Sequence, residues 1–274
     1  MPLILALVSS LMWGIADFVG GLASKRTPAM IVVGFSQLVG LAIIVVIGLV
    51  GGFDWNPSAV PWALASGIAG FVGLNFFYRA LATGRMGIVS PIASLGALVP
   101  LSAGLLSGDA PTTVQLIGVA LAIAGIVLAS GPELSGGADA RPVLFAVGAA
   151  AGFGVCLWTI SVGSSYSVIT TMTLMRLVSV MIAAVSIAVA RTAFDLPSID
   201  WKLVITAGAF DVLANVTFGL ATTGDLLSLV SVLGSLYPVA TVLLAWAILK
   251  ERLQPIQYVG VAAALAGVAA IAGG

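Results

Sequence analysis

The amino-acid sequence contains one pattern written twice. Residues 75–84 (NFFYRALATG) recur as residues 215–224 (NVTFGLATTG), and residues 142–146 restart the pattern of residues 2–6. Three more positions return in the same order: Gln115, Gly118 and Gly125 return as Gln257, Gly260 and Gly267. The sequence therefore predicts two halves that fold alike.

Both halves consist almost entirely of apolar segments long enough to cross a membrane. Hydrophobic residues make up 61% of the chain and charged residues 7%, whereas a soluble domain has about 25% charged residues. A membrane-spanning helix needs about 20 apolar residues. Cutting the sequence at its polar, Pro and Gly positions predicts ten helices, at 3–22, 29–50, 60–82, 86–107, 112–130, 142–163, 167–190, 201–222, 226–248 and 254–272.

The expected fold is an all-α integral membrane protein with ten transmembrane helices in two inverted five-helix repeats. An odd number of crossings in each repeat forces the second repeat to enter the bilayer upside down, a plan typical of secondary transporters. We expect a first repeat at residues 1–130, a hinge loop at 131–141 and a second repeat at 142–274. Small residues predict close helix contacts within this plan: Gly67, Gly70, Gly73, Gly148 and Gly152.

The basic residues that lie outside the apolar segments are confined to the odd-numbered loops and the helix ends beside them. They are Lys25, Arg26, Arg85, Arg141, Arg191, Lys202, Lys250 and Arg252. The even-numbered loops carry acids such as Asp54, Asp109 and Asp225 instead. The positive-inside rule therefore predicts a multi-pass protein of the cell inner (plasma) membrane, with the odd-numbered loops in the cytoplasm and both termini outside.

The composition removes several classes of function. The net charge is zero, so we expect no nucleic-acid partner, and the chain has no His and a single Cys, so we expect no metal site and no cofactor. No Gly-x-x-x-x-Gly-Lys-Ser/Thr motif is present to hold ATP. The expected partners are the lipid bilayer, a small-molecule substrate and protons. The oligomeric state is left open between monomer and homodimer.

Four ionisable residues interrupt the apolar segments, and such residues usually face a bundle interior or an aqueous cavity. At about 1.5 Å per residue, Asp17 and Arg79 lie near the same membrane face, whereas Arg176 and Asp211 both approach the midplane. These depths predict two ion pairs, Asp17 with Arg79 and Asp211 with Arg176. The alternative for the first pair is that both side chains extend to the interface, and for the second a purely structural polar network.

Polar and aromatic residues at helical spacing surround these charges and complete a predicted substrate cavity. Its residues are Trp13, Asp17, Asn75, Tyr78, Arg79, Ser90, Ser94, Trp158, Arg176, Asp211, Asn215, Ser231, Ser235 and Tyr237. Asp211 and Asp17 are the candidates for proton coupling. The alternative for Trp13 and Trp158 is a place at the lipid interface, which Trp favours.

Three prolines predict kinks within the helices expected at 86–107 and 226–248. They are Pro91, Pro100 and Pro238, and the last two correspond across the repeats. A proline within a helix frees a carbonyl group and bends the helix. Transporters use such interruptions at binding sites, although a fixed kink without a moving part would leave the same pattern.

Several motifs resemble the EamA-type family of the drug/metabolite transporter superfamily. They are Tyr237-Pro238, Lys250-Glu251-Arg252-Leu253 with Gln257 and Gly260, Met12-Trp13-Gly14 and Phe77-Tyr78-Arg79-Ala80-Leu81. The resemblance implies ten helices around a central cavity, with Trp13 and Tyr78 lining it. It also implies the export of amino acids, other small metabolites or drugs, and in related branches sugar uptake.

The sequence departs from this family pattern in two ways. The interval from Pro100 to Gly118 is four residues shorter than that from Pro238 to Gly260, and the Glu-Arg element is reduced to Gly108-Asp109-Ala110. About one helical turn is therefore missing from the first repeat. The family is also usually drawn with cytoplasmic termini, whereas the loop charges here predict the reverse.

The leading hypothesis is a secondary transporter, not an enzyme, that moves an amino acid-like or related metabolite outward by alternating access. The first alternative is an uptake carrier or facilitator for sugars or metabolites. A channel is the second. The third is an intramembrane aspartyl protease with Asp17 and Asp211 as its carboxylates, which the different depths of the two residues disfavour.

Overall fold

A computed structural model describes residues 1–84, 86–130, 141–224, 226–250 and 254–273 of the chain. Within these residues the chain is helical and contains no strand. Most of the predicted hinge loop, 131–140, lies outside them, as do Arg85, Asp225, Glu251, Arg252 and Leu253.

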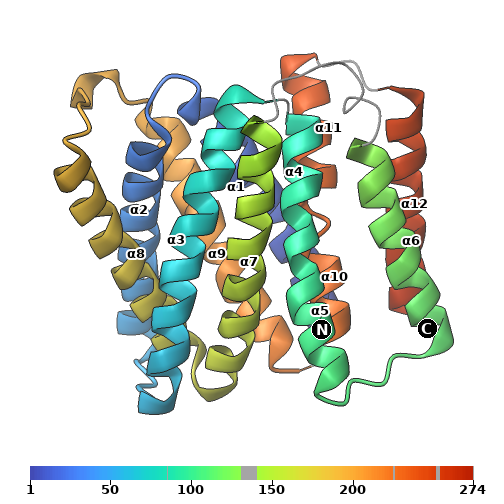
Figure 1. Ribbon diagram of the computed structural model, residues 1–274. Coiled ribbons are helices and arrows are strands. Elements are labelled where there is room, and N and C mark those ends of the chain that lie inside the picture. Colours follow the sequence, from blue (N-terminus) through green and yellow to red (C-terminus); the bar gives the residue numbers. More distant parts are fainter. Residues whose placement is uncertain (85, 131–140, 225, 251–253, 274) are drawn as a thin grey trace.

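The helices follow the predicted segments to within three residues at each end. They are α1 (Pro2–Ser24), α2 (Ala29–Gly51), α3 (Val60–Thr83), α4 (Met86–Ser94), α5 (Leu98–Leu106), α6 (Thr113–Ser130), α7 (Arg141–Tyr166), α8 (Val168–Ala190), α9 (Trp201–Thr222), α10 (Leu227–Gly234), α11 (Tyr237–Leu249) and α12 (Pro255–Gly273), with short 3-10 turns η1 (Pro57–Ala59), η2 (Leu95–Ala97) and η4 (Leu196–Ser198). Figure 1 shows them as one bundle of roughly parallel and antiparallel rods.

Eight stretches of the described chain are long and apolar enough to cross a membrane. α6 contributes a shorter apolar helix, Thr113–Gly125, and α12 does not meet the same criterion within its described residues. The chain is therefore a multi-pass membrane protein, and ten crossings remain a prediction.

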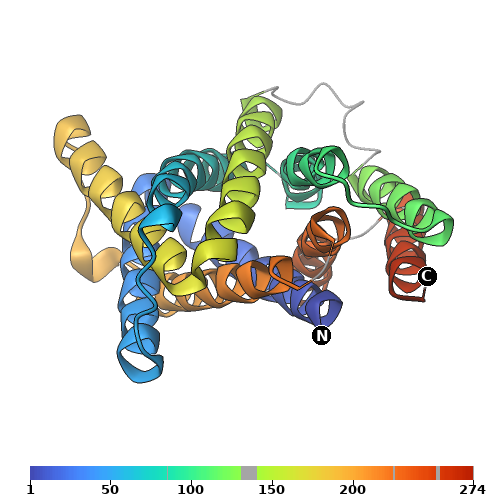
Figure 2. The same cartoon turned by 90° about the horizontal axis from the view of Figure 1, so that it is seen from below.

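The packing of α1–α6 is mirrored by that of α7–α12. α3 packs against α7 as α9 packs against α1, and α3 meets α8 as α9 meets α2. α6 and α12 pack mainly against each other at one edge of the bundle, as Figures 1 and 2 show. This exchange of equivalent contacts is the packing expected of two related halves that run in opposite directions.

Small and hydroxyl side chains hold the crossing helices together. A Cβ added to Gly152 of α7 would lie 2.6 Å from Cα of Gly73 in α3, so these backbones touch as the glycine spacing predicts. Ser9 of α1 donates a hydrogen bond to the carbonyl oxygen of Ala214 in α9 (2.7 Å). Such bonds satisfy polar groups that lipid cannot.

All six described basic residues of the loop set lie at the end of the bundle opposite the termini. They are Lys25, Arg26, Arg141, Arg191, Lys202 and Lys250, at the ends of α1, α7, α8, α9 and α11 that face away from the N and C labels in Figure 1. The charge asymmetry of the sequence is thus an asymmetry of the folded molecule.

The helices predicted at 86–107 and 226–248, hereafter the two proline-containing segments, are both interrupted. η2 lies between α4 and α5, and Ser235 and Leu236 separate α10 from α11. Each interruption lies just before its proline, Pro100 in α5 and Pro238 in α11, which lack the backbone N–H that a continuous helix would use. Pro91 instead lies inside α4.

The first interrupted segment also stabilises the start of the second. α5 packs against α10, and the Asp109 carboxylate accepts a hydrogen bond from the backbone N–H of Ser228 (2.8 Å) in the first turn of α10. A carboxylate there satisfies an otherwise unpaired donor and complements the helix dipole. The shortened loop that departs from the family pattern therefore serves as a helix cap.

Candidate functional site

A cavity lies at mid-depth in the bundle, where both halves meet. It encloses about 690 Å³ of unfilled space, counting its opening. The lining side chains come from α1, α2, α3, α4, η2 and α7 to α11, close to the middle of each membrane-spanning segment. Two apolar clusters pack on either side of it, one toward the basic end (with Ala23 and Leu81) and one toward the termini (with Ala6 and Ala221).

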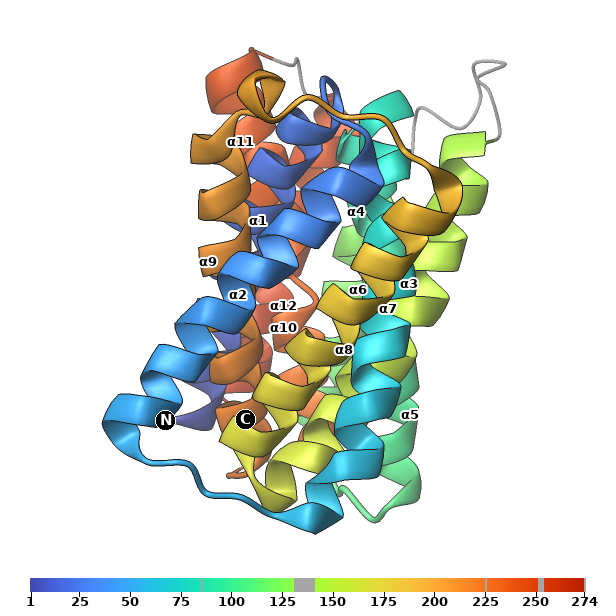
Figure 3. The same cartoon turned by 90° about the vertical axis from the view of Figure 1, so that its left-hand side faces the viewer.

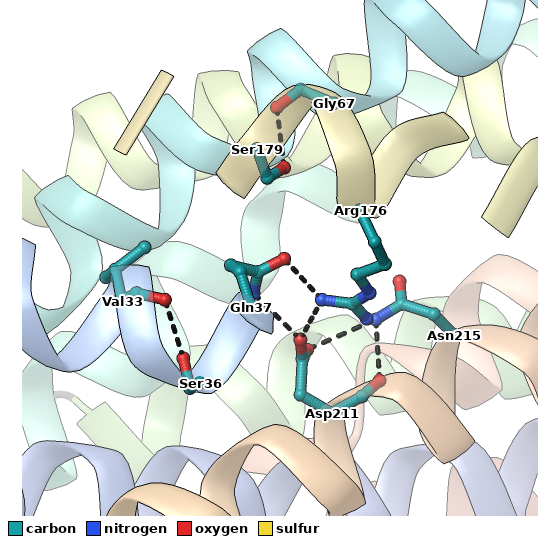
Figure 4. A network of polar contacts seen from close by, with 8 residues as sticks. All are labelled: Val33, Ser36, Gln37, Gly67, Arg176, Ser179, Asp211 and Asn215. Carbon is teal, nitrogen blue, oxygen red and sulfur yellow. Dashed lines mark hydrogen bonds and ion pairs between the residues drawn. The ribbon is translucent and has the colours of Figure 1, made fainter. Parts of the chain in front are cut away.

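A polar network built on Arg176 forms one wall of this cavity. Nη1 of Arg176 donates to Oδ2 of Asp211 and to Oε1 of Gln37, each at 2.5 Å. Gln37 donates back to Oδ2 of Asp211 (3.2 Å), and Asn215 donates to Oδ1 of Asp211 (3.1 Å). Figure 4 shows these four residues, hereafter the Arg176 network, converging from α2, α8 and α9.

The two charges of the Arg176 network are buried and largely cancel each other. The Arg176 side chain is 2% exposed and the Asp211 side chain 13%. Breaking a buried pair costs about 3–5 kcal/mol, because the remaining charge is left uncompensated. Nε and Nη2 of Arg176 nevertheless have no hydrogen-bond acceptor among the described residues. Two N–H groups of the network are therefore buried without a described acceptor.

Local packing explains how so large a cation fits between the helices. α2 packs against both α8 and α9, and Figure 3 shows α2 and α8 side by side on this side of the bundle. A Cβ added to Gly40 of α2 would lie 3.4 Å from Nε of Arg176. This is an ordinary van der Waals distance, so Gly40 lies directly beside the guanidinium group.

A second wall, hereafter the Asp17 side, consists of Asp17, Trp13 and Tyr237. Asp17 is 6% exposed and lines the cavity, yet its carboxylate forms no hydrogen bond or ion pair with any described residue. Trp13 precedes it by one helical turn, with its ring centroid 6.4 Å from that of Tyr237. The Tyr237 hydroxyl is buried and unpartnered in the described structure. Two polar groups here are thus available to a ligand.

The cavity contains a majority of the residues that the sequence assigns to it. Eight of the predicted residues line it: Trp13, Asp17, Ser94, Arg176, Asp211, Asn215, Ser235 and Tyr237. The predicted pairing of Asp211 with Arg176 is confirmed. The interruptions of both proline-containing segments also line the cavity, through Ser94 and Ala97 of the first and Gly234 and Ser235 of the second.

The predicted pairing of Asp17 with Arg79 is wrong. Arg79 is exposed and does not line the cavity. The neighbouring Tyr78 is buried against Gly20 of α1, and successive residues of a helix point about 100° apart, so Arg79 faces outward. Tyr78 itself lies outside the cavity, although the family resemblance placed it there.

Four further predicted residues do not line the cavity. Asn75, Ser90 and Ser231 are buried between helices; Ser231 donates to the carbonyl oxygen of Leu227 (2.6 Å). Trp158 is 37% exposed and packs edge-on against Trp62, with the ring centroids 5.9 Å apart. Trp158 thus faces away from the cavity, which the preceding residues Cys156 and Leu157 line.

Gln37 is the main residue that the sequence analysis missed. It is a polar side chain in the middle of the apolar α2, 4% exposed, and it contacts both charges of the Arg176 network. The signal that could have identified it is the amide itself. Burying an amide without partners costs free energy, so an amide within an apolar segment indicates a polar partner. Ser179, Phe153 and Cys156 also line the cavity unpredicted.

Comparisons with known proteins agree with this architecture. A solved structure described only as "Crystal structure of protein" matches with a TM-score of 0.77 at 18% sequence identity, over 98% of this chain and 95% of its own. This likeness shows a shared fold. A comparison with curated proteins found no significant match. The sequence model of the EamA-like transporter family matches residues 1–131 and 140–273, which is nearly the whole sequence, and the chain therefore belongs to the EamA-like transporter family.

Proposed function

We propose that this membrane protein is a secondary carrier that moves a small metabolite across the bilayer by alternating access to the central cavity. In this proposal ten crossings form two inverted repeats, 1–130 and 142–274, joined by 131–141. The observation that carries the proposal is the position of the cavity, because interrupted helices from both halves line it at mid-depth. Transporters of inverted-repeat design bind substrate at such a place.

The direction and the substrate follow from the family and from the cavity chemistry together. Export of an amino acid-like or related metabolite is the direction that family membership favours. Sugar or metabolite uptake is the alternative within the same superfamily. The buried charges of Asp17, Arg176 and Asp211 favour a polar substrate that bears charge over a neutral sugar.

Of the two acids predicted to couple protons to transport, Asp17 is the better candidate. Asp211 is engaged by Arg176, Gln37 and Asn215, so protonating it would break several contacts. Asp17 has no such contacts among the described residues. An imposed pH gradient should therefore drive substrate accumulation in vesicles that contain the wild-type protein. It should drive none in vesicles that contain the Asp17→Asn protein.

The same contacts disfavour an intramembrane protease. An aspartyl protease needs two carboxylates that share a proton, whereas Asp211 is held by a guanidinium group.

The orientation proposed from the basic loops places both termini outside the cytoplasm. A reporter fused to Gly274 tests that orientation, and a cytoplasmic signal would overturn it.

Counterflow in proteoliposomes tests the carrier directly. Vesicles loaded with unlabelled compound should take up the same labelled compound transiently and saturably, because a carrier exchanges one bound substrate for another. A thermal-shift screen with amino acids, amines, sugars and nucleobases selects the compound, since a ligand of the folded state raises its apparent stability. Uptake that is linear in concentration and shows no counterflow would indicate a channel and sink the proposal.

A further inference from the structure

The Asp17 side of the cavity has the chemistry of a cation-binding site. We infer that the substrate carries a net positive charge, as an amine, a guanidine or a quaternary ammonium compound does, and that this charge binds beside Asp17. The inference rests on the proposed carrier function and, among the amino acid-like or related metabolites of that proposal, selects those that carry a net positive charge.

The charge balance of the cavity is the first argument. Three of the described lining residues bear charge: Asp17, Arg176 and Asp211. Arg176 and Asp211 neutralise each other at 2.5 Å, so an ionised Asp17 gives the cavity one uncompensated negative charge. Burying an unpaired charge away from water is costly. A bound proton removes that cost when the site is empty, and a ligand with a single positive charge removes it when the ligand displaces the proton.

The side chains around Asp17 are the second argument. Trp13 and Tyr237 present aromatic rings in the same wall of the cavity, and aromatic faces attract ammonium and guanidinium groups. The buried Tyr237 hydroxyl has no partner in the described structure, so its oxygen is available to accept a hydrogen bond from an N–H group. Asp17 supplies the charge and the two rings supply a matching surface.

The state of Arg176 argues against an anion or a zwitterion. A bound carboxylate would have to share Arg176 with Asp211, and the two negative charges would repel each other. A zwitterion would also leave the excess charge of the cavity unchanged. The Arg176 network, whose two charges already balance, thus has no free charge for an anionic group. A monocation therefore fits the cavity best.

Four compounds that share a phenol ring and differ in charge test the inference on the purified full-length protein. They are tyramine (cation), tyrosine (zwitterion), 4-hydroxyphenylacetate (anion) and 4-ethylphenol (neutral). Titration calorimetry should show tyramine binding at least about tenfold more tightly than each of the others, a difference of about 1.4 kcal/mol. Isobutylamine (cation) against valine (zwitterion) repeats the test without a ring, and choline repeats it without an N–H group.

Two variants separate the charge of Asp17 from general effects on the fold. Asp17→Asn keeps nearly the same size and should reduce tyramine affinity to that of 4-ethylphenol, while 4-ethylphenol affinity stays unchanged. Arg79→Gln removes a charge from an exposed position outside the cavity and should leave the preference for tyramine intact.

Three results would overturn the inference: equal or tighter binding of tyrosine or 4-hydroxyphenylacetate, a preference for tyramine that survives in Asp17→Asn, or no binding of tyramine, isobutylamine or choline at millimolar concentration. The carrier proposal fails separately. Counterflow of a zwitterion would reject the cation site and keep the carrier, whereas tyramine binding without counterflow would keep the site and reject the carrier.

Discussion

The two walls of the cavity treat their charges in opposite ways. In the Arg176 network a guanidinium group, a carboxylate and two amides from three helices contact one another. On the Asp17 side a buried carboxylate has no partner among the described residues. The comparison suggests that the first wall supports the fold at the centre of the membrane and the second is reserved for a ligand. Substitutions should therefore affect stability on one wall and binding on the other.

Arg176→Met should give the largest loss of stability. The free energy of unfolding should fall by about 3–5 kcal/mol, because Asp211 is left as a buried charge without its counter-ion. Thermal and denaturant unfolding of the protein in detergent micelles measures this loss.

The matched control is the double variant Arg176→Met/Asp211→Leu, which removes both charges and should recover much of the lost stability. A single variant as stable as the parent would show that the Arg176 network does not support the fold.

Gln37→Leu should have a smaller effect on the same wall. It keeps the volume of the side chain but removes one acceptor for Nη1 of Arg176 and one donor to Asp211, while the ion pair remains. We expect a loss of about 1–3 kcal/mol, the usual cost of leaving a buried polar group unpaired. The measurement is again unfolding in micelles. A loss as large as that of Arg176→Met would mean that the amide, not the ion pair, is the centre of the network.

Asp17→Asn should leave stability unchanged or raise it by up to about 1 kcal/mol, because it removes an uncompensated buried charge and breaks no contact between described residues. Substrate counterflow should fall to background in the same protein. Unfolding and counterflow measured on one preparation check both expectations. Destabilisation comparable to that of Gln37→Leu would erase the difference between the two walls.

Arg79→Gln should have the smallest effect. The side chain is exposed, so stability should change by less than about 0.5 kcal/mol and transport should stay at the parental rate. A loss of counterflow in this variant would return Arg79 to the site that the sequence predicted for it.

Patterns along the chain predicted the helices well, because their limits depend on local chemistry. Apolar runs end where Pro, Gly and charged residues begin, and the structure ends its helices within three residues of those points. The prolines likewise marked the two interrupted segments. The pairing of Arg176 with Asp211 was predictable because both depths pointed to the midplane.

The remaining site residues were not predictable, since depth does not fix the direction of a side chain around its helix. Arg79 has the depth expected for a partner of Asp17, but Tyr78 occupies the surface that faces α1. Leu157 lines the cavity whereas the adjacent Trp158 does not. Gln37 was missed for a different reason, because it has neither a charge nor a counterpart in the other half to draw attention to it.

The interrupted segments have a mechanical consequence for the bundle. α4 and α5 contain nine residues each, or about 14 Å of helix, less than half the thickness of a bilayer core of about 30 Å. α1, α2, α3, α7, α8 and α9 run unbroken through 22 to 26 residues. The described segments that line the cavity thus comprise six continuous helices and two that are interrupted at the cavity. A helix interrupted at mid-membrane can bend at the interruption, so that the half near one membrane surface moves while the other half stays in place.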